Sequence, residues 1–480
     1  MGKGTTLAIE LRPHGSEPVF LALAQAIIAE IERGRLGPGD PLPGTRALAR
    51  SLRLNRNTVD AAYHELAMQG WLATEPSRGT FVARDLPDLG RGKRVAPLGR
   101  SQALAAGGES GGRPMLSISD GTPDPRLMPT VALGQAFRRA LASPGFLSGG
   151  AYGDRRGSPM LREALAHYLK EERGLAVSAG DMLIARGSQM ALFLAASAAV
   201  ERGQAIAVET PGYPLAWAAF RAAGANVVGV PVDEGGLDIG ALERLAASDK
   251  NLKAVYLTPH HQYPTTVTLG AARRLRLMDL CRRHGLCIIE DDYDHEYRFQ
   301  GRPVLPLAAR AGADVPVIHL GSLSKLLAPG IRVGYAVAPP ALLQRMADRR
   351  EAIDRQGDVP LENALASLIV DGTLRRHARK ARRIYQTRRD RLDGLIGERF
   401  ADVADWTLPA GGLAIWLRLK VGHSAETWAA NAARLGLSVL PGIRFTLDAA
   451  RPPEAFRLGF ASLGDEDMLR AVDLLAKARP

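Results

Sequence analysis

A segment rich in glycine, proline, serine and arginine divides the chain into two patterned parts. It covers residues 84–115, RDLPDLGRGKRVAPLGRSQALAAGGESGGRPM, and shows no sustained helical or strand periodicity. Such a composition is typical of a flexible linker, because it lacks the regularly spaced apolar side chains that a packed core requires. We therefore expect two folded units in the 480-residue chain, residues 16–83 and residues 116–480.

The larger part has the pattern of an α/β fold. Ala/Leu-rich helical stretches alternate with short apolar runs, at residues 205–208, 254–257, 287–289 and 317–320. This alternation predicts a mainly parallel sheet covered by helices. No apolar run approaches the roughly 20 residues that span a bilayer, and the N-terminus lacks the apolar region of a signal peptide. We expect a cytoplasmic protein with no membrane partner.

Helical spacing and turn residues predict three helices and a hairpin in the smaller part. The expected elements are helices at 16–34, from 45 and at 55–70, and strands at 71–73 and 80–82. In the third helix, Val59, Ala62, Tyr63 and Leu66 form the stripe that should be buried. Three helices and a hairpin form a winged helix-turn-helix, whose third helix enters the major groove of DNA. A small helical interaction domain without a DNA role is the alternative.

The charge of this part and its resemblance to a known family favour a DNA-binding role over a small interaction domain. The net charge is +12, and from Arg33 to Arg56 there are six arginines against the single acid Asp40. The stretch PGDPLPGTRALARSLRLNRNTVDAAYHELAMQGWLATEPSRGTFVA closely resembles the DNA-binding domain of the GntR regulator family. The resemblance implies contacts to operator phosphates or bases from the second and third helices, and minor-groove contacts from the wing. The residues concerned are Arg46, Arg56, Asn57 and Thr58 on the helices, and Arg78 and Gly79 on the wing.

A lysine motif in the larger part indicates cofactor chemistry. Lys325 lies in Gly-Ser-Leu-Ser-Lys, Arg332 follows seven positions later, and Glu-Asp-Asp-Tyr at 290–293 follows a strand-like run upstream. A lysine can form a Schiff base with an aldehyde, a carboxylate can keep a pyridine nitrogen protonated, and hydroxyls with an arginine can bind a phosphate. Together these groups meet the requirements of pyridoxal 5'-phosphate.

The larger part also resembles the fold-type I aminotransferases, and the two-part architecture resembles the MocR subfamily of GntR regulators. The resemblance implies that Lys325 is the lysine of the internal aldimine. It assigns the phosphate to Ser322, Ser324 and Arg332, and Ser188 and Gln189 open a helix whose N-terminal N–H groups favour the same phosphate.

Other site residues follow from the same resemblance. Asp291 matches the partner of the pyridine nitrogen, although Asp292 next to it has the same chemistry. Tyr293 would hydrogen-bond the phenolic oxygen, and Tyr213 would contact the ring or serve packing alone. Tyr152 resembles a tyrosine that reaches the phosphate of the other subunit, which implies a homodimer.

Arg457 matches the arginine that grips the α-carboxylate of an amino acid, a task that suits a guanidinium. One departure from the aminotransferase pattern is evident. The usual Asn-Pro-x-Gly is replaced by Thr-Pro-His-His-Gln-Tyr-Pro at 258–264, which is typical of the MocR subfamily. We expect no metal site at His261, since no second ligand is evident nearby.

These features predict a transcriptional regulator that binds operator DNA and senses an amine, an amino acid or pyridoxal phosphate itself. An aminotransferase with a fused DNA-binding domain is the alternative, since the expected cofactor residues are all present; an inert dimerisation scaffold is a third possibility.

The arginine-rich stretch 375–383 has helical spacing and is interpreted as a solvated face, with an auxiliary DNA contact as the alternative. The two cysteines, Cys281 and Cys287, are expected to be buried thiols.

Overall fold

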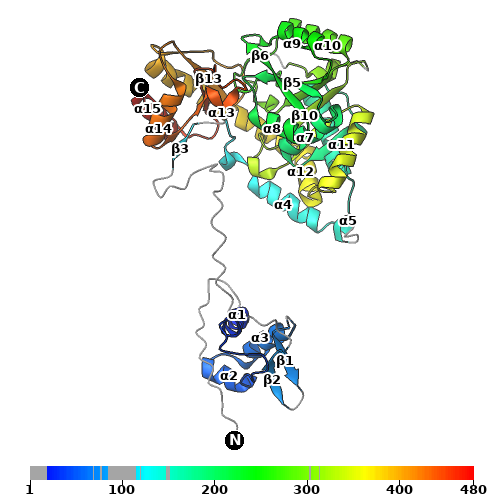
Figure 1. Ribbon diagram of the computed structural model, residues 1–480, viewed down its shortest axis with the longest axis vertical. Helices are drawn as coiled ribbons and strands as arrows, with labels where there is room; N and C mark the ends of the chain where they lie inside the picture. Colours follow the sequence, from blue (N-terminus) through cyan, green and yellow to red (C-terminus); the bar gives the residue numbers. More distant parts are fainter. Residues whose placement is uncertain are drawn as a thin grey trace. The chain divides into compact units, whose positions relative to one another are not determined.

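The computed structural model describes residues 19–68, 70–75, 78–84, 115–118, 121–147, 152–301, 304–312 and 314–480. The chain divides into two compact units, Met1–Ser110 and Gly111–Pro480 (Figure 1). The predicted start of the first helix at Ser16 and most of the predicted linker lie outside the described residues.

The smaller unit contains the predicted three helices and hairpin. Its elements are α1 (Val19–Glu32), α2 (Thr45–Leu52), α3 (Arg56–Met68), β1 (Leu72–Glu75) and β2 (Gly79–Val82). The predicted stripe of α3 is buried in one core with Leu23 and Ile27 of α1 and Leu48 of α2. Asn55 caps α3 as expected, because its Oδ1 accepts the N–H of Asn57 at 2.9 Å. The winged helix-turn-helix prediction is confirmed.

The larger unit is built on an eight-stranded sheet with the order β4-β11-β10-β9-β8-β5-β6-β7. All its strands run in one direction except β11 and β7, so the mainly parallel prediction is confirmed. The strands are β4 (Met182–Ala185), β5 (Ala205–Thr210), β6 (Asn226–Asp233), β7 (Gly236–Leu237), β8 (Leu252–Leu257), β9 (Cys287–Asp292), β10 (Val317–Ser322) and β11 (Gly334–Val337).

Helices cover both faces of this sheet. One face packs against α7 (Gly187–Ala199), α8 (Pro214–Ala222) and α11 (Pro340–Ile353), and the other against α9 (Ile239–Ser248) and α10 (Ala271–His284). Cys281 and Cys287 are buried thiols, as predicted. No helix in the described part of the chain is long and apolar enough to cross a membrane.

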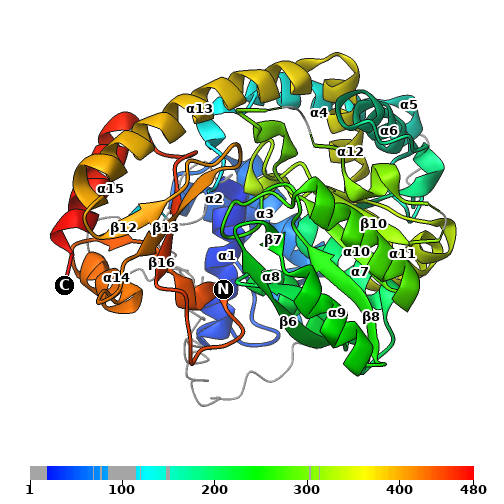
Figure 2. The same cartoon turned by 90° about the horizontal axis from the view of Figure 1, so that it is seen from above.

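A second, smaller sheet with the order β12-β13-β16-β15 belongs to the C-terminal part of this unit. Figure 2 shows the long helix α13 (Thr373–Phe400) extending from the region of α4 and α12 to α15, along the smaller sheet. The arginine-rich stretch forms part of this helix, as its spacing predicted, and the apolar side chains Ala378, Ala381 and Tyr385 at helical spacing are buried. The remaining elements are α4 (Thr130–Leu141), α5 (Pro144–Leu147), α6 (Pro159–Arg173), α12 (Val359–Val370), α14 (Ala425–Arg434), α15 (Asp465–Lys477), β3 (Leu116–Ser117), β12 (Ala404–Trp406), β13 (Ala414–Leu419), β14 (Leu437–Ser438), β15 (Leu440–Pro441) and β16 (Ala455–Gly459).

Candidate cofactor site

A cavity of about 220 Å³ lies where the parallel strands β8, β9 and β10 end and α7 begins. This is the edge of an open α/β sheet at which ligands bind. The cavity is lined by Thr122, Ser188, Tyr213, Tyr256, Thr258, Tyr263, Asp291, Tyr293, Ser322, Ser324, Lys325, Pro329 and Arg332. The structure therefore brings together most of the residues that the sequence singled out for a cofactor.

Strand alternation separates the two candidate carboxylates. Successive residues of β9 face opposite sides of the sheet, and Asp291 lines the cavity whereas Asp292 does not. Asp291 is buried, and its Oδ2 accepts a hydrogen bond from the hydroxyl of Tyr256 at 3.0 Å. Burial raises the pKa of Asp291 to about 7, and the nearby charge of Asp292 acts in the same direction. A cationic group beside Asp291 would favour its charged form.

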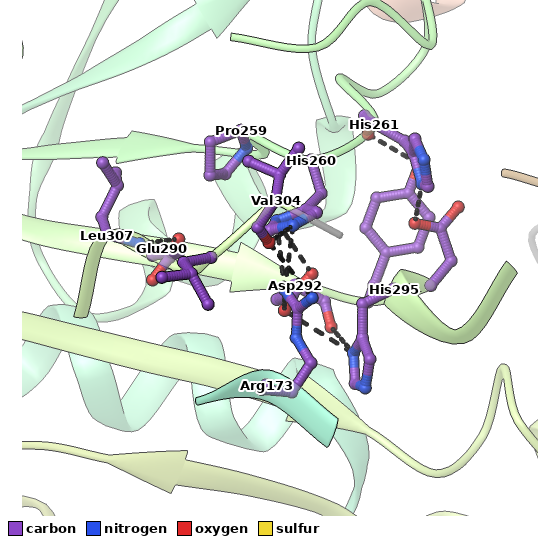
Figure 3. Close-up of polar contacts among 12 residues, drawn as sticks. Arg173, Pro259, His260, His261, Glu290, Asp292, His295, Val304 and Leu307 are labelled. Atoms are coloured by element: carbon purple, nitrogen blue, oxygen red, sulfur yellow. Dashed lines mark hydrogen bonds and ion pairs between the residues drawn. The ribbon is translucent and has the colours of Figure 1, made fainter. Parts of the chain in front are cut away.

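Asp292 points away from the cavity into a buried polar cluster (Figure 3). Arg173 Nη2 donates to its Oδ2 at 2.6 Å, and ring nitrogens of His260 and His295 lie 3.4 Å and 3.6 Å from its two oxygens. Burial by itself raises the pKa of this carboxyl, but Arg173 and His260 hold it well below its usual range. Asp292 is therefore an ionised structural anion whose charge is balanced by these neighbours.

Arg332 and Ser188, in the first turn of α7, bring hydrogen-bond donors to the cavity. Gly187 has φ +75°, and a Cβ there would lie 2.9 Å from Cζ of Arg332. Arg332, itself left-handed with φ 52°, donates from Nη2 to the Arg186 carbonyl at 3.1 Å. The Oγ of Ser324 is buried and has no hydrogen-bond partner among the described residues. A phosphate fits this cradle, since it would accept from a guanidinium, a hydroxyl and helix N-terminal N–H groups.

Lys325 lies three residues beyond the end of β10, on the same cavity. Its Nζ donates to the carbonyl of Gly121 at 3.3 Å, and its own carbonyl accepts from the hydroxyl of Tyr297 at 3.1 Å. The second contact fixes the backbone of the lysine, so the position of its side chain on the cavity wall is set by the fold.

Three tyrosines form the aromatic wall. Tyr213 and Tyr263 meet edge to face with ring centroids 4.9 Å apart, and the hydroxyl of Tyr293 donates to the His261 carbonyl at 3.0 Å. Gln189 is not part of the cavity lining; its amide donates to the hydroxyl of Tyr213 at 3.3 Å. Gln189 therefore reaches the cavity through Tyr213.

Two other predicted residues lie outside the cavity lining. Arg457 is buried on β16, its Cζ is 4.3 Å from the ring centroid of Tyr263, and its Nη1 donates to the Pro264 carbonyl at 2.8 Å. Through the ring of Tyr263, Arg457 contacts the cavity wall. Tyr152 is 69% exposed, and Cζ of Arg355 lies 4.0 Å from its ring centroid.

The predicted DNA-binding side chains are accessible on the smaller unit. Arg46, Arg56 and Asn57 are exposed, and Thr58 is half-buried. Arg56 lies 3.4 Å from Asp60 in a solvent-exposed pair, and Arg78 pairs with Glu75 at 2.6 Å beside the wing. Gly79 has φ +115°, a conformation that favours glycine at the start of β2.

Sequence reasoning missed several cavity residues, namely Thr122, Tyr256, Thr258, Tyr263 and Pro329. Tyr256 had a usable signal, because it occupies a strand-like run that ends at Leu257, directly before Thr258. No sequence signal indicated Thr122, since it lies far from the other lining residues along the sequence.

The fold and this cavity define a two-part protein, with a winged helix-turn-helix unit and a unit of the fold-type I aminotransferase architecture. Residues 21–82 match the family "Bacterial regulatory proteins, gntR family", and residues 121–475 match "Aminotransferase class I and II". The chain belongs to the MocR subfamily of GntR-family transcriptional regulators, in which these two families are fused.

Named relatives agree with this assignment. The chain is 32% identical to the pyridoxine biosynthesis transcriptional regulator PdxR of Corynebacterium glutamicum over 82% of either chain. It is 30% identical to the probable rhizopine catabolism regulatory protein MocR of Rhizobium meliloti, over 96% of this chain and 94% of the relative. Among solved structures, the α-aminoadipate aminotransferase LysN of Thermus thermophilus, complexed with N-(5'-phosphopyridoxyl)-L-leucine, superimposes with a TM-score of 0.69 at 30% identity, covering 76% of this chain and 92% of LysN.

Proposed function

We propose that this regulator holds pyridoxal 5'-phosphate in the cavity, attached to Lys325, and that an amine or amino acid entering the same cavity changes its affinity for operator DNA. The observation that carries the proposal is the joint placement of Lys325, Asp291 and Arg332 on one cavity of about 220 Å³. Pyridoxal phosphate has an aldehyde, a pyridine nitrogen and a phosphate, and each of these three residues suits one of the groups.

The chain's own residues would orient the cofactor. Arg332, the hydroxyls of Ser322 and Ser324, and the N-terminus of α7 at Ser188 would bind the phosphate. Asp291 would pair with the pyridine nitrogen, and Tyr256 would hold that carboxylate in place through its hydrogen bond.

The aromatic wall would complete the orientation. Tyr293 faces the cavity as the candidate partner of the phenolic oxygen, and Tyr213 is the candidate ring contact. When bound, the cofactor supplies an electrophilic carbon that an amine can attack in place of Lys325.

The test of cofactor attachment is the absorbance of the purified protein with added pyridoxal phosphate. The wild-type protein should be yellow, and Lys325→Ala should lose the absorbance of the lysine-bound cofactor. Lys253→Ala is the matched control, because Lys253 is an exposed lysine of the same unit, on β8. Borohydride reduction followed by peptide mass spectrometry identifies the modified lysine. Equal spectra of Lys325→Ala and wild type would remove Lys325 from the proposal.

Catalysis is a second candidate function, and the similarity to LysN over 76% of the chain favours it. Arg457 would then bind the substrate carboxylate, although it is not part of the cavity lining and its guanidinium packs against the ring of the lining residue Tyr263. Conversion of a stoichiometric amount of amino acid to its keto acid in a single turnover, without multiple turnovers, would support sensing over metabolic catalysis.

The proposed assembly is a homodimer. The exposure of Tyr152, at 69%, leaves its ring accessible for a contact with a second subunit. Sedimentation velocity of the full chain with and without cofactor measures the oligomeric state directly. A monomer under both conditions would contradict the proposal.

A further inference from the structure

A second pocket, of about 420 Å³, lies on the side of β9 that Asp292 faces. Its walls come from α13, from the C-terminal end of α6, and from the segment that follows the short helix His295–Tyr297. It shares no lining residue with the cavity that contains Lys325. The function proposed above does not use this pocket.

Arginine dominates the lining. Four arginines of α13 line the pocket at spacings of four, seven and eight residues, which places them on one face of the helix. They are Arg375, Arg379, Arg382 and Arg383. Arg298, after the short helix, supplies a further guanidinium from a different segment of the chain.

Four of these five arginines have no ionic partner among the described residues. Arg375 pairs with Glu171 and Glu172, the latter at 2.8 Å. The other four, Arg298, Arg379, Arg382 and Arg383, form no side-chain hydrogen bond or ion pair with any residue that the structure describes. The acidic lining residue Glu296 lies 3.1 Å from a ring nitrogen of His295 and so has a partner of its own.

Two donor nitrogens of Arg298 have no acceptor among the residues that the structure describes. Its Nε and Nη1 are buried from solvent without a hydrogen-bond partner in the described chain. Burial and the neighbouring charge of Arg173 lower the pKa of this guanidinium. Buried donors without acceptors are costly, so an anion seated here would satisfy them.

We propose that this pocket binds a small anion with a phosphate or diphosphate group. Guanidinium groups from two segments line one pocket, and the tetrahedral oxygens of phosphate accept paired hydrogen bonds from arginine. A volume of about 420 Å³ is within the range of small-molecule sites. Arg379, Arg382 and Arg383 are exposed, but the buried nitrogens of Arg298 in the same pocket favour a compact ligand over the backbone of a DNA duplex.

Three residues of the pocket lining contact Asp292, the neighbour of the cavity residue Asp291. Arg173, His260 and His295 line the pocket, and all three contact Asp292, as Figure 3 shows. Asp292 is joined by one peptide bond to Asp291. A ligand in the pocket would therefore contact side chains that bind Asp292, on the strand that also carries Asp291 of the proposed cofactor site.

The experiment is isothermal titration of inorganic pyrophosphate into the full-length, cofactor-saturated protein at physiological ionic strength, without DNA and without divalent metal. Wild type should bind pyrophosphate saturably. Arg379→Ala/Arg383→Ala should weaken binding by roughly tenfold or more, because charge-assisted contacts are lost. The matched control is Arg345→Ala/Arg349→Ala, which removes two exposed arginines four residues apart on α11 and gives the same change in net charge.

Retained binding in the control together with loss in the pocket variant supports the proposal, provided that both variants melt within a few degrees of wild type. Equal weakening in the two double variants would assign the effect to net charge and overturn it. Undetectable binding to wild type would also overturn it. If pyrophosphate does not bind but operator affinity falls in the pocket variant alone, these arginines contact DNA and the small-anion site is refuted.

Discussion

Asp291→Asn is expected to stabilise the cofactor-free protein at alkaline pH and to abolish cofactor retention. The carboxyl is 4% exposed and has the ionised Asp292 as its neighbour, so its charge is unfavourable unless a cation lies beside it. Asparagine keeps the shape and can still accept the hydrogen bond from Tyr256, but it carries no charge. The substitution therefore removes an electrostatic cost that cofactor binding would otherwise offset.

The magnitude follows from the pKa of Asp291, which is about 7 in the folded protein against an ordinary 3.8. That separation corresponds to roughly 4 kcal/mol. Because the folded carboxyl holds its proton more tightly than the unfolded one, its contribution to stability is fully present below pH 3.8 and is lost as pH rises through 7. Asparagine avoids this loss, so its advantage should approach ~4 kcal/mol at pH 8 and fall to roughly 2 kcal/mol at pH 5.

Differential scanning calorimetry of the cofactor-free, full-length proteins measures this difference. At pH 8 the unfolding temperature of the larger unit should be several degrees higher in Asp291→Asn than in the wild type, and at pH 5 the difference should be smaller. Asp292→Asn is the control, for which we expect a change of opposite sign in the free energy of unfolding. It leaves Arg173 without its ionic partner and should destabilise the folded protein by about 3 kcal/mol or more. A pH-independent difference between Asp291→Asn and wild type would refute the argument from burial.

Three further substitutions test the DNA and ligand sites. Arg56→Ala should weaken operator binding in a mobility-shift titration by roughly 1–3 kcal/mol if the side chain contacts a base, while the melting of the protein stays nearly unchanged because the Arg56–Asp60 pair is exposed. Gly187→Ala should reduce retention of pyridoxal phosphate on dialysis by about tenfold or more, since φ is +75° and the new Cβ would meet Arg332; normal retention would remove Arg332 from the phosphate site. Arg457→Ala should abolish the effect of amino acids on operator affinity without changing the cofactor spectrum, and an unchanged response would show that Arg457 is not the anchor.

The sequence was sufficient to predict the elements because their patterns are local. Each apolar run proposed as a strand, such as residues 317–320, lies within a strand of the sheet. Boundaries were less accurate: the first wing strand was expected at 71–73 but is Leu72–Glu75, since pairing with β2 decides where it ends. Hydrogen bonding to a partner strand is not visible in a single segment.

Site residues that depend on three-dimensional direction could not be predicted in the same way. The resemblance selected Asp291 in the motif at 290–293, but the chemistry of the two aspartates did not separate them; the orientation of β9 places Asp291 on the cavity and Asp292 beside Arg173. The aromatic contact between Tyr263 and Arg457 joins residues far apart in sequence. The charge of the α13 arginines was evident, whereas the contribution of Arg298 to the same pocket was not.

The two neighbouring aspartates also bear on how such a site can change during evolution. Their different surroundings depend on how many residues precede them in β9, because each added or deleted residue turns every later side chain to the other face of the sheet. Deleting one residue from Cys287–Ile289 would move Asp292 into the place of Asp291 at the cavity and Tyr293 into the place of Asp292, so that Arg173 would lose its carboxylate. The apolar positions of β9 can therefore accept exchanges of similar side chains, whereas its length is fixed for as long as the cavity and the buried arginine both need a carboxylate.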